Sequence, residues 1–322
     1  MTYSRIAGTG SYLPANVVTN HDLEKTMDTT DEWIQERTGI KRRHIAADDE
    51  STSDLALAAA NQALDMAGLT AEDIDLIIIA TTTPDKVFPG TACIVQRRLG
   101  IGGCAAFDIQ AACSGFVYGL DLADRHIRTG GAKNALVIGA ETLSRLTNWE
   151  DRTTAVLFGD GAGAVVLQET DEPGIISTHI HADGQYEDLL QVPQGVSKGY
   201  DITRAGEAFI QMNGNAVFRR AVATLDSIAR ETLDKNNIDK HDLDWFVPHQ
   251  ANMRIISAAA KKLDMPMERV IVTVDEHANT SAASIPLALD VAVRDGRIKR
   301  GELLLFEAFG AGFTWGSALL RF

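Results

Sequence analysis

The stretch FDIQAACSGFVYGLD, residues 107–121, changes within a few residues from a strand-like apolar run to a helix-like run. Similar strand-like runs recur along the first part of the chain, separated by helix-like stretches rich in Ala and Leu. They are DLIIIATT (75–82), AAFDIQ (105–110), NALVIGAE (134–141) and GAVVLQ (163–168). This alternation predicts an α/β fold.

The second part of the chain repeats the order of the first. Its strand-like runs are LDWFVPHQ (243–250), RVIVTVDE (269–276), GELLLFEAFG (301–310) and GSALLRF (316–322). Each part ends in a glycine-rich turn before its last strand, FGDGAGAVVL in the first and FGAGFTWGSALL in the second. We therefore predict two duplicated halves, residues 1–172 and 173–322, joined by polar, Gly-rich material that forms a cap. Equivalent loops of the halves should converge where the halves meet, and a site is expected there.

Composition narrows the class of protein. With 322 residues and 45% hydrophobic content, the chain is long enough for a compact core. The first residues lack a signal-peptide pattern, and no apolar run approaches the ~20 residues of a membrane span. The three cysteines have no C-x-x-C spacing, so we expect a cytoplasmic protein with free thiols. The net charge of −14 opposes general binding to nucleic acid or to anionic membranes.

Cys113 is the first candidate for chemistry. It lies at the predicted first turn of a helix, where the helix dipole lowers the pKa of a thiol and favours the thiolate. Its small neighbours in QAACSG allow a substrate to approach closely. Cysteine is also one of the residues most often buried, so this position alone does not distinguish a nucleophile from a packing residue.

Two loops of the second half contain partners for Cys113. His249 in VPHQAN ends a strand-like run and suits a hydrogen-bond donor or general base. Asn279 in HANTSAAS lies in the loop that corresponds to that of Cys113, although Asn, Thr and Ser there also fit an N-cap cluster. A cysteine, a histidine and an asparagine in corresponding loops of two repeats predict a catalytic Cys-His-Asn set.

Other patterns indicate neither a nucleotide nor a metal. The segment GDGAGA (159–164) precedes a strand, whereas a dinucleotide-binding loop follows one. The segment FGAGFTWG also leads into a strand. The glycines of both segments are expected instead to bring backbone N–H groups near a reacting carbonyl, as an oxyanion hole requires. His179 and His181 alternate as on one face of a strand but have no third ligand nearby, so we expect no metal site.

Six motifs together resemble the β-ketoacyl-acyl-carrier-protein synthase III family, which belongs to the thiolase-like condensing enzymes. In chain order they are DEWIQERTGI, QAACSGF, FGDGAGA, VPHQAN, ANTSAAS and FGAGFTWGSAL. The resemblance implies a thiolase-like five-layer αβαβα fold, a homodimer, and Cys113, His249 and Asn279 as the catalytic residues. It implies that Cys113 takes an acyl group from a short acyl-CoA such as acetyl-CoA. Malonyl-acyl carrier protein then loses CO2 and condenses with that acyl group, which initiates type II fatty acid synthesis without a cofactor.

The resemblance also implies binding roles. Backbone N–H groups of Cys113 and Ala311 would form the oxyanion hole, and Leu143 and Phe88 would bound the acyl pocket, Phe88 from a partner subunit. Residues implied to bind coenzyme A are Trp33, Arg37, Arg152 and Asn252, and those implied to dock the acidic carrier protein are Arg219, Arg220, Arg254, Lys261 and Lys262. As alternatives, Trp33 fits a core position and the cations fit ordinary solvated helix faces.

At three positions this sequence departs from the family pattern, where glycine is common: Ala278, Ala311 and Thr153. None removes a catalytic group, but the added side chains bear on the choice of primer.

Three alternative functions stay open. They are a related condensing enzyme of secondary metabolism with another acyl-CoA primer, a cysteine hydrolase, and a noncatalytic acyl carrier or interaction protein. The tandem repeat disfavours the hydrolase.

Overall fold

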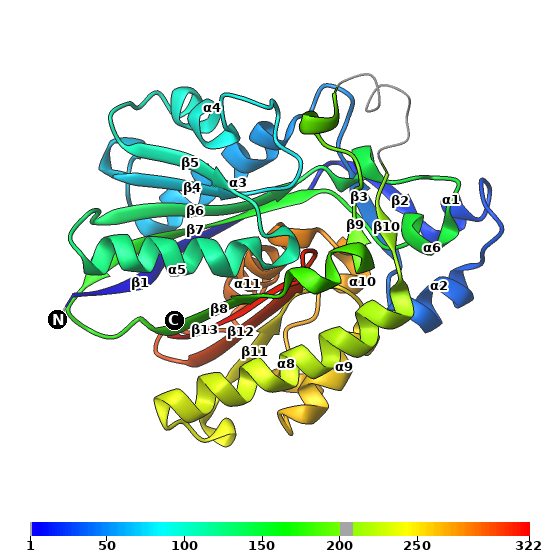
Figure 1. Cartoon of the computed structure of the whole chain (residues 1–322). Coiled ribbons are helices and arrows are strands. Elements are labelled where there is room, and N and C mark those ends of the chain that lie inside the picture. Colours follow the sequence, from blue (N-terminus) through cyan, green and yellow to red (C-terminus); the bar gives the residue numbers. More distant parts are fainter. Residues whose placement is uncertain (1, 200–208) are drawn as a thin grey trace.

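Two β-sheets and three layers of helices form the body of the protein. The computed structural model describes residues 2–199 and 209–322. Figure 1 shows the order of the layers: outer helices, a sheet, two central helices, a second sheet and further outer helices. The predicted five-layer αβαβα arrangement is therefore confirmed.

The first sheet has five strands in the order β1–β7–β6–β4–β5. Strand β4 is parallel to β5 and β6, whereas β7 is antiparallel to β6 and β1. Every residue of β4 is buried, as expected for an interior parallel strand covered on both faces. The bounds are β1 Tyr3–Tyr12, β4 Leu76–Ala80, β5 Ala105–Ile109, β6 Asn134–Glu141 and β7 Gly161–Thr170, with outer helices α3 Thr52–Ala67 and α4 Thr91–Arg98.

The second sheet repeats this pattern with four strands in the order β11–β12–β13–β8. Strand β11 is parallel to β12, and β13 is antiparallel to β12 and β8, just as β4, β6, β7 and β1 pair in the first sheet. The bounds are β8 Ile175–Ala182, β11 Trp245–Pro248, β12 Leu303–Gly310 and β13 Thr314–Arg321, with outer helices α8 Gly214–Asn236 and α9 Met253–Lys262.

The central helices α5 (Gly115–Arg128) and α11 (Ser284–Arg294) lie between the sheets. Each helix hydrogen-bonds to the outer strand of the other half. Asp121 of α5 accepts a bond of 2.6 Å from the Thr178 hydroxyl of β8, and Asp290 of α11 accepts one of 2.7 Å from the Thr9 hydroxyl of β1. Corresponding residues thus connect the two halves in a reciprocal way, as expected for a duplicated chain.

One predicted strand is wrong. Within 269–276, Val270 forms only an isolated bridge to Phe246 of β11, and Val274–His277 forms the short helix α10. The Gln250 side-chain amide hydrogen-bonds to backbone groups at 271, 273 and 274. Because this side chain satisfies the groups that a strand would pair, the segment turns into a helix instead of extending the sheet.

Shorter elements surround one end of the two sheets, at the right of Figure 1. Strands β9 and β10 belong to the predicted cap between the halves, of which residues 200–208 lie outside the described residues. No described helix is both long and apolar enough to cross a membrane. The bounds are α1 Asn20–Leu23, α2 Asp31–Thr38, α6 Arg152–Ala155, β2 Asn16–Thr19 paired with β3 Arg42–Ile45, and β9 Leu190–Gln191 paired with β10 Gln211–Met212.

Candidate active site

Cys113 lies in the turn that joins β5 to α5. The turn is a single 3-10 turn, Ala112–Ser114, and Ala112 has a φ of 46°, in the left-handed region. The corresponding turn of the second half, Ser281–Ala283, precedes α11, and Ser281 has a φ of 51°. The two turns contact each other, so corresponding loops of the halves converge.

Two glycines allow each sheet to approach the turn of the other half. A Cβ added to Gly310 of β12 would lie 2.7 Å from the backbone nitrogen of Cys113. A Cβ added to Gly139 of β6 would come closer still to the carbonyl oxygen of Ala282. Side chains at these two positions would therefore push the turns away from the ends of the strands.

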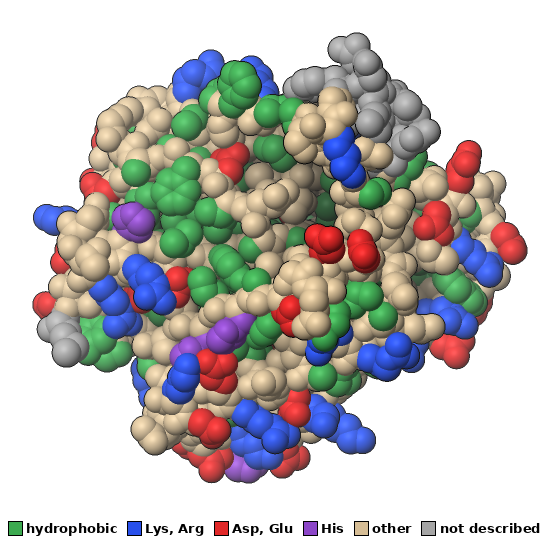
Figure 2. All heavy atoms as spheres, in the orientation of Figure 1, with side chains coloured by type: hydrophobic (Ala, Val, Ile, Leu, Met, Phe, Trp, Pro, Cys, Tyr) green, Lys and Arg blue, Asp and Glu red, His purple; other side chains and the backbone are tan. Residues whose placement is uncertain are grey.

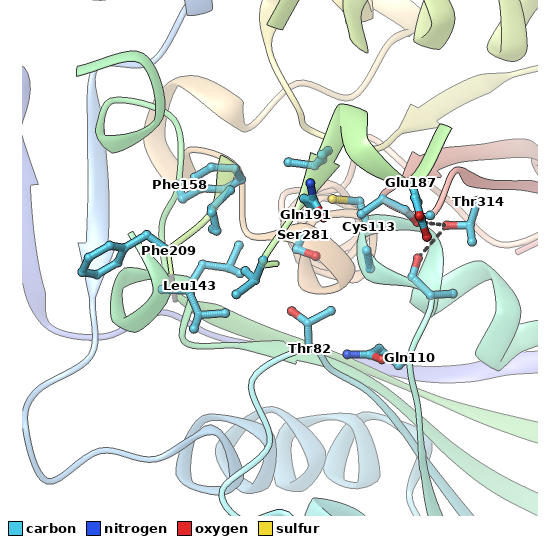
Figure 3. Close-up of a pocket in the computed structure, with 18 of the residues that line it drawn as sticks. Thr82, Gln110, Cys113, Leu143, Phe158, Glu187, Gln191, Phe209, Ser281 and Thr314 are labelled. Carbon is cyan, nitrogen blue, oxygen red and sulfur yellow. Dashed lines mark hydrogen bonds between the residues drawn. The ribbon is translucent and has the colours of Figure 1, made fainter. Parts of the chain in front are cut away.

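Two cavities meet at Cys113. The first, of about 870 Å³, extends from the Cys113 turn to β9 and is shown in Figure 3. The second, of about 650 Å³, is lined by His249 and Asn279 as well as by Cys113. Phe158 and Leu190 also line both cavities. The structure thus brings the three predicted catalytic residues to one cavity, with a second cavity beside the thiol.

The thiol of Cys113 is less acidic than the sequence suggested. Burial raises its pKa to about 12, and the nearby Glu141 carboxylate adds to the rise, while hydrogen bonds from Ser281 and its own amide oppose it. The expectation of a lowered pKa is therefore wrong, because loss of hydration outweighs the position of Cys113 before a helix. Attack on a carbonyl by this sulfur requires loss of the thiol proton.

His249 lies at the end of β11 with its ring buried. Its Nδ1 is 2.7 Å from Ser284 Oγ, and that oxygen also accepts a bond of 3.3 Å from the Gln250 N–H. A Ser284 hydroxyl that donates to Nδ1 leaves the ring proton on Nε2. Nε2 is buried and has no partner among the described residues, and burial lowers the pKa of His249 to about 3. His249 is thus a neutral donor that lines the second cavity.

The loop of Asn279 is fastened to the first half. The Asn279 N–H donates to Leu157 O at 2.9 Å, and the Gly159 N–H donates to Asn279 O at 3.1 Å. Asn279 Oδ1 accepts from the Ser281 N–H at 2.9 Å, so the amide nitrogen is the group available to donate into the cavity. The preceding Ala278 has a φ of 57°, where L residues are strained, which explains why glycine is common there.

The expected oxyanion role of GDGAGA is wrong. The Gly159 N–H already bonds to Asn279, and residues 161–164 lie within β7, where their backbone groups pair with neighbouring strands. The other glycine-rich turn does reach the site, because Ala311 lines the first cavity together with Cys113.

The residues implied to bind coenzyme A gather at one end of the second cavity. Trp33, Arg37 and Asn252 line it, and Arg152, which is not a lining residue, has its guanidinium 5.2 Å from the centre of the Trp33 ring. Arg152 also donates to the Asp28 carbonyl at 2.6 Å. Asn252 uses its Oδ1 to cap helix α9, so only its amide N–H groups are available to a ligand.

The two residues implied to bound the acyl pocket differ in position. Leu143 is buried and lines the first cavity. Phe88 lines neither cavity and is 82% exposed in the loop before α4. Within one chain, therefore, Phe88 is a surface residue.

The five implied docking cations lie on α8 and α9, which pack together. Figure 2 shows basic side chains in the region of these helices, with acidic ones among them. Arg220 is half-buried with its guanidinium 3.6 Å from the centre of the Tyr186 ring, and Lys262 is 3.9 Å from Asp226. The exposed members are Arg219, Arg254, Lys261 and Lys262.

Sequence reasoning missed several residues around the triad. The sequence showed Ser281 and Ser284 only as members of the motif ANTSAAS. It showed Phe309 only as a member of FGAGF. In the structure the Phe309 ring meets the His249 ring edge-on, with 5.5 Å between the ring centres. Glu141 ends an apolar strand and carried no signal beyond being a charged residue after a buried run.

Across residues 2–199 and 209–322, no cluster of three metal-ligating side chains is found, and His181 pairs with Glu231 at 2.9 Å.

Comparisons with known proteins identify the family. The family model of 3-oxoacyl-[acyl-carrier-protein (ACP)] synthase III matches residues 107–184, and that of its C-terminal part matches 233–322. Beta-ketoacyl-[acyl-carrier-protein] synthase III of Thioalkalivibrio sulfidiphilus is 67% identical over 100% of both chains. The crystal structure of 3-oxoacyl-[acyl-carrier-protein] synthase III from Aquifex aeolicus has a TM-score of 0.94 at 50% identity, covering 99% of this chain and 100% of that one.

The priming β-ketosynthase of the R1128 polyketide biosynthetic pathway also has a TM-score of 0.94, at 37% identity, covering 99% of this chain and 96% of that one. The identity to the synthases named above is higher and extends over the whole chain. The chain belongs to the 3-oxoacyl-[acyl-carrier-protein] synthase III family and is an acyltransferase-type condensing enzyme that initiates fatty acid synthesis.

Proposed function

We propose that the protein condenses an acyl group from a short acyl-CoA, such as acetyl-CoA, with malonyl-acyl carrier protein to give 3-oxoacyl-acyl carrier protein and CO2. One observation carries the proposal: Cys113 lies where two cavities meet, and one of them is lined by two neutral donors, His249 and Asn279. A nucleophile in this position can keep an acyl group in one cavity while a second thioester enters through the other.

In the first half-reaction, the Cys113 sulfur attacks the thioester carbon of acyl-CoA, and coenzyme A leaves. The backbone N–H groups of Cys113 and Ala311 stabilise the oxyanion, since both residues line the first cavity. Trp33, Arg37 and Arg152 bind the nucleotide end of coenzyme A. The acyl chain then lies in the first cavity against Leu143.

In the second half-reaction, the malonyl thioester carbonyl accepts hydrogen bonds from His249 Nε2 and Asn279 Nδ2. These donors stabilise the enolate that forms as CO2 leaves, and the enolate carbon attacks the acyl carbon on Cys113. Phe309 beside the His249 ring helps to exclude water. Because neutral donors supply the stabilisation, we propose that the reaction needs no metal or organic cofactor.

The protein is expected to act as a homodimer. Strand β5 forms an edge of the first sheet, and Val87 and Phe88 nearby are 53% and 82% exposed. Figure 2 shows hydrophobic side chains gathered over the region of β5. A second copy on this edge would bury these side chains and pair the free strand edge, and it would bring Phe88 to the acyl cavity of the partner.

The exposed cations Arg219, Arg254, Lys261 and Lys262 are proposed to dock the acyl carrier protein. They interrupt an acidic chain, and Arg254 itself lines the second cavity, so a carrier docked here reaches Cys113 through that cavity. Electrostatic steering toward such a patch raises the association rate of an acidic partner. The cytoplasmic location of the enzyme stays a prediction.

The decisive experiment is to incubate the pure protein with acyl-CoA and malonyl-acyl carrier protein and to analyse both proteins by mass spectrometry. The proposal requires an acyl mass on Cys113 and a 3-oxoacyl product on the carrier. A cysteine hydrolase would release free acid without that product, and a noncatalytic protein would never gain the acyl mass.

The likeness to the R1128 priming β-ketosynthase supports a second candidate for the primer, an acyl-CoA other than acetyl-CoA. A panel of acyl-CoA primers, scored by acylation of Cys113, distinguishes the two. Preference for acetyl-CoA supports the short primer proposed above, and preference for a longer or branched acyl-CoA supports the second candidate.

A further inference from the structure

Gln250 is a fully buried residue of the loop VPHQAN that the proposed mechanism does not use. Its amide nitrogen donates to the carbonyl groups of Pro248 at 2.8 Å and Ile271 at 3.0 Å. Its amide oxygen accepts from the backbone N–H groups of Thr273 at 2.8 Å and Val274 at 3.1 Å. The donors and the acceptor of the amide are therefore all paired with backbone groups, and the reverse orientation of the amide would pair none of them.

The segment that Gln250 holds leads to Asn279. The side chain of Gln250 binds the start of helix α10, and Asn279 lies two residues after the end of this helix. Val274 donates its N–H to Gln250, and its carbonyl accepts from the Ala278 N–H at 3.0 Å. A shift at the start of this single-turn helix is therefore passed on to the backbone of Asn279.

The backbone of Ala278 explains why an anchor is needed here. Its φ of 57° lies in the left-handed region, which is strained for a residue with a side chain. Such a conformation persists only where the surrounding structure fixes it. After Ala278, the backbone of Asn279 is fastened to Leu157 and Gly159. Before it, Gln250 supplies the anchor through α10.

Gln250 also holds His249, its neighbour in the chain. The Gln250 N–H donates to Ser284 Oγ at 3.3 Å, and that oxygen is 2.7 Å from His249 Nδ1. The side-chain amide binds the Pro248 carbonyl on the other side of His249. Gln250 thus fixes the backbone around His249 and, with the other end of its amide, the segment that leads to Asn279.

Other contacts hold each donor separately. The His249 N–H donates to Glu307 O of β12 at 2.7 Å, in the second half. The Asn279 N–H donates to Leu157 O at 2.9 Å, in the first half. These bonds fasten the two donors to different parts of the protein, whereas the Gln250 amide spans the segments that carry them.

We propose that Gln250 is a positioning residue that sets the separation between His249 Nε2 and Asn279 Nδ2, the two proposed donors to the malonyl thioester. The inference rests on the proposed decarboxylation step. One carbonyl oxygen can accept from both donors only when their N–H groups point to the same place, because hydrogen bonds weaken steeply with distance and angle. Gln250 lines neither cavity, so it acts through the backbone groups that it holds and not on the thioester itself.

The test separates the two half-reactions in Gln250→Met, which keeps the approximate volume of the side chain but removes its amide hydrogen bonds. Enzyme acylated with acetyl-CoA and freed of coenzyme A is mixed with malonyl-acyl carrier protein, and CO2 release is followed over a single turnover. The rate at saturation should fall by about 30- to 100-fold, as a small misplacement of the donors requires. The carrier-protein concentration that gives half of this rate, and the rate of Cys113 acylation, should each change less than about threefold.

A double variant distinguishes positioning from support of the fold. If Gln250 acts by making the two donors converge, its loss costs little once one donor is gone. Gln250→Met combined with Asn279→Ala should therefore release CO2 within about threefold of the rate of Asn279→Ala alone. Losses that multiply in the double variant would show that Gln250 only supports the fold, and would overturn the proposal.

Thr232→Val is the matched control. Thr232 is also fully buried, and its hydroxyl is 2.6 Å from Ser317 Oγ, but it lines neither cavity. This variant loses a buried hydrogen bond and should keep the ratio of CO2 release to acylation of the unchanged enzyme. An altered ratio would show that general destabilisation is enough to change it, and the step-selective loss in Gln250→Met would then not support positioning.

Should Gln250→Met fail to fold, Gln250→Glu decides by the same ratio. Its carboxyl keeps the bonds from the backbone N–H groups but loses at least one bond to a carbonyl, so CO2 release should fall by about 10-fold while acylation is retained. No loss, or equal loss in both half-reactions, would contradict the positioning role. Absence of CO2 release by the unchanged enzyme would instead overturn the proposed function.

Discussion

Ser284 Oγ lies 2.7 Å from Nδ1 of His249, and this contact decides which ring nitrogen carries the proton. The hydroxyl also accepts the Gln250 N–H, and we assign its own proton to Nδ1. The opposite nitrogen, Nε2, is buried without a protein partner and lines the cavity beside Cys113. One serine of α11 thus converts a buried histidine into an oriented hydrogen-bond donor.

Ser284→Ala should lower the rate of malonyl decarboxylation by about 10- to 100-fold, because Nδ1 loses its donor and the ring proton is no longer held on Nε2. Release of CO2 from malonyl-acyl carrier protein measures this rate. Acylation of Cys113, measured by mass, should change less than about twofold. An equal loss in both assays would show that Ser284 supports the fold rather than the donor.

His249→Ala and Asn279→Ala should impair decarboxylation more than acylation, because in the proposed mechanism their side chains donate to the malonyl thioester carbonyl. We expect losses of about 10²- to 10³-fold in CO2 release, as for other oxyanion donors. Cys113→Ala should abolish acylation while the fold is retained. The division of labour is contradicted if all three variants lose both half-reactions to the same extent.

Buried neutral histidines should make the fold sensitive to acid. Burial lowers the pKa of His249 to about 3 and that of His277 to about 4, from about 6.5 in an unfolded chain. As pH falls below about 6.5, the unfolded chain binds protons that the folded chain does not, so stability present above this pH is lost on acidification. Each histidine should cost about 2 kcal/mol of unfolding free energy between pH 7.5 and 5.

Urea unfolding at the two pH values measures this loss. His277→Gln should show a smaller difference between the two conditions, because the substituted side chain does not titrate. The exposed His241→Gln serves as control and should behave as the unchanged protein. Equal pH dependence in all three proteins would contradict the assignment of the loss to buried histidines.

Trp33→Ala should raise the KM for acyl-CoA by about 10-fold, because we propose that the indole in the second cavity stacks on the adenine of coenzyme A. The same variant should acylate normally from a pantetheine thioester that lacks the nucleotide. Steady-state kinetics with both donors provides the measurement. A similar rise in KM for both donors would instead show that Trp33 supports the wall of the cavity and does not bind the nucleotide.

Reversal of charge on α8 and α9 should selectively weaken the binding of malonyl-acyl carrier protein. Arg219→Glu combined with Lys261→Glu should raise the KM for malonyl-acyl carrier protein by about 10-fold or more at low salt, and the effect should shrink as salt increases. Lys133→Glu, on the exposed surface of the first half, is the control and should leave this KM unchanged. An unchanged KM in the double variant would contradict docking at α8 and α9.

Much of the molecule follows from local patterns in the sequence. The repeated order of strand-like and helix-like runs predicted two related halves, and the reciprocal bonds of Asp121 and Asp290 agree with that duplication. The three catalytic candidates could be found because each lies in a loop at a corresponding place of the two repeats. The run 269–276 was misjudged because the Gln250 side chain, from another part of the chain, satisfies its backbone groups.

The sequence by itself determined the α/β repeat, the family and the positions of Cys113, His249 and Asn279, because these depend on residue order and short-range periodicity. Only the tertiary structure decided the chemical state of the site. Burial raises the pKa of Cys113 and lowers that of His249, Ser284 hydrogen-bonds to the His249 ring, and the Ser281 N–H holds the Asn279 amide oxygen. Hydration and hydrogen-bond partners are supplied by segments distant along the chain, so their effects emerge only when the two halves pack together.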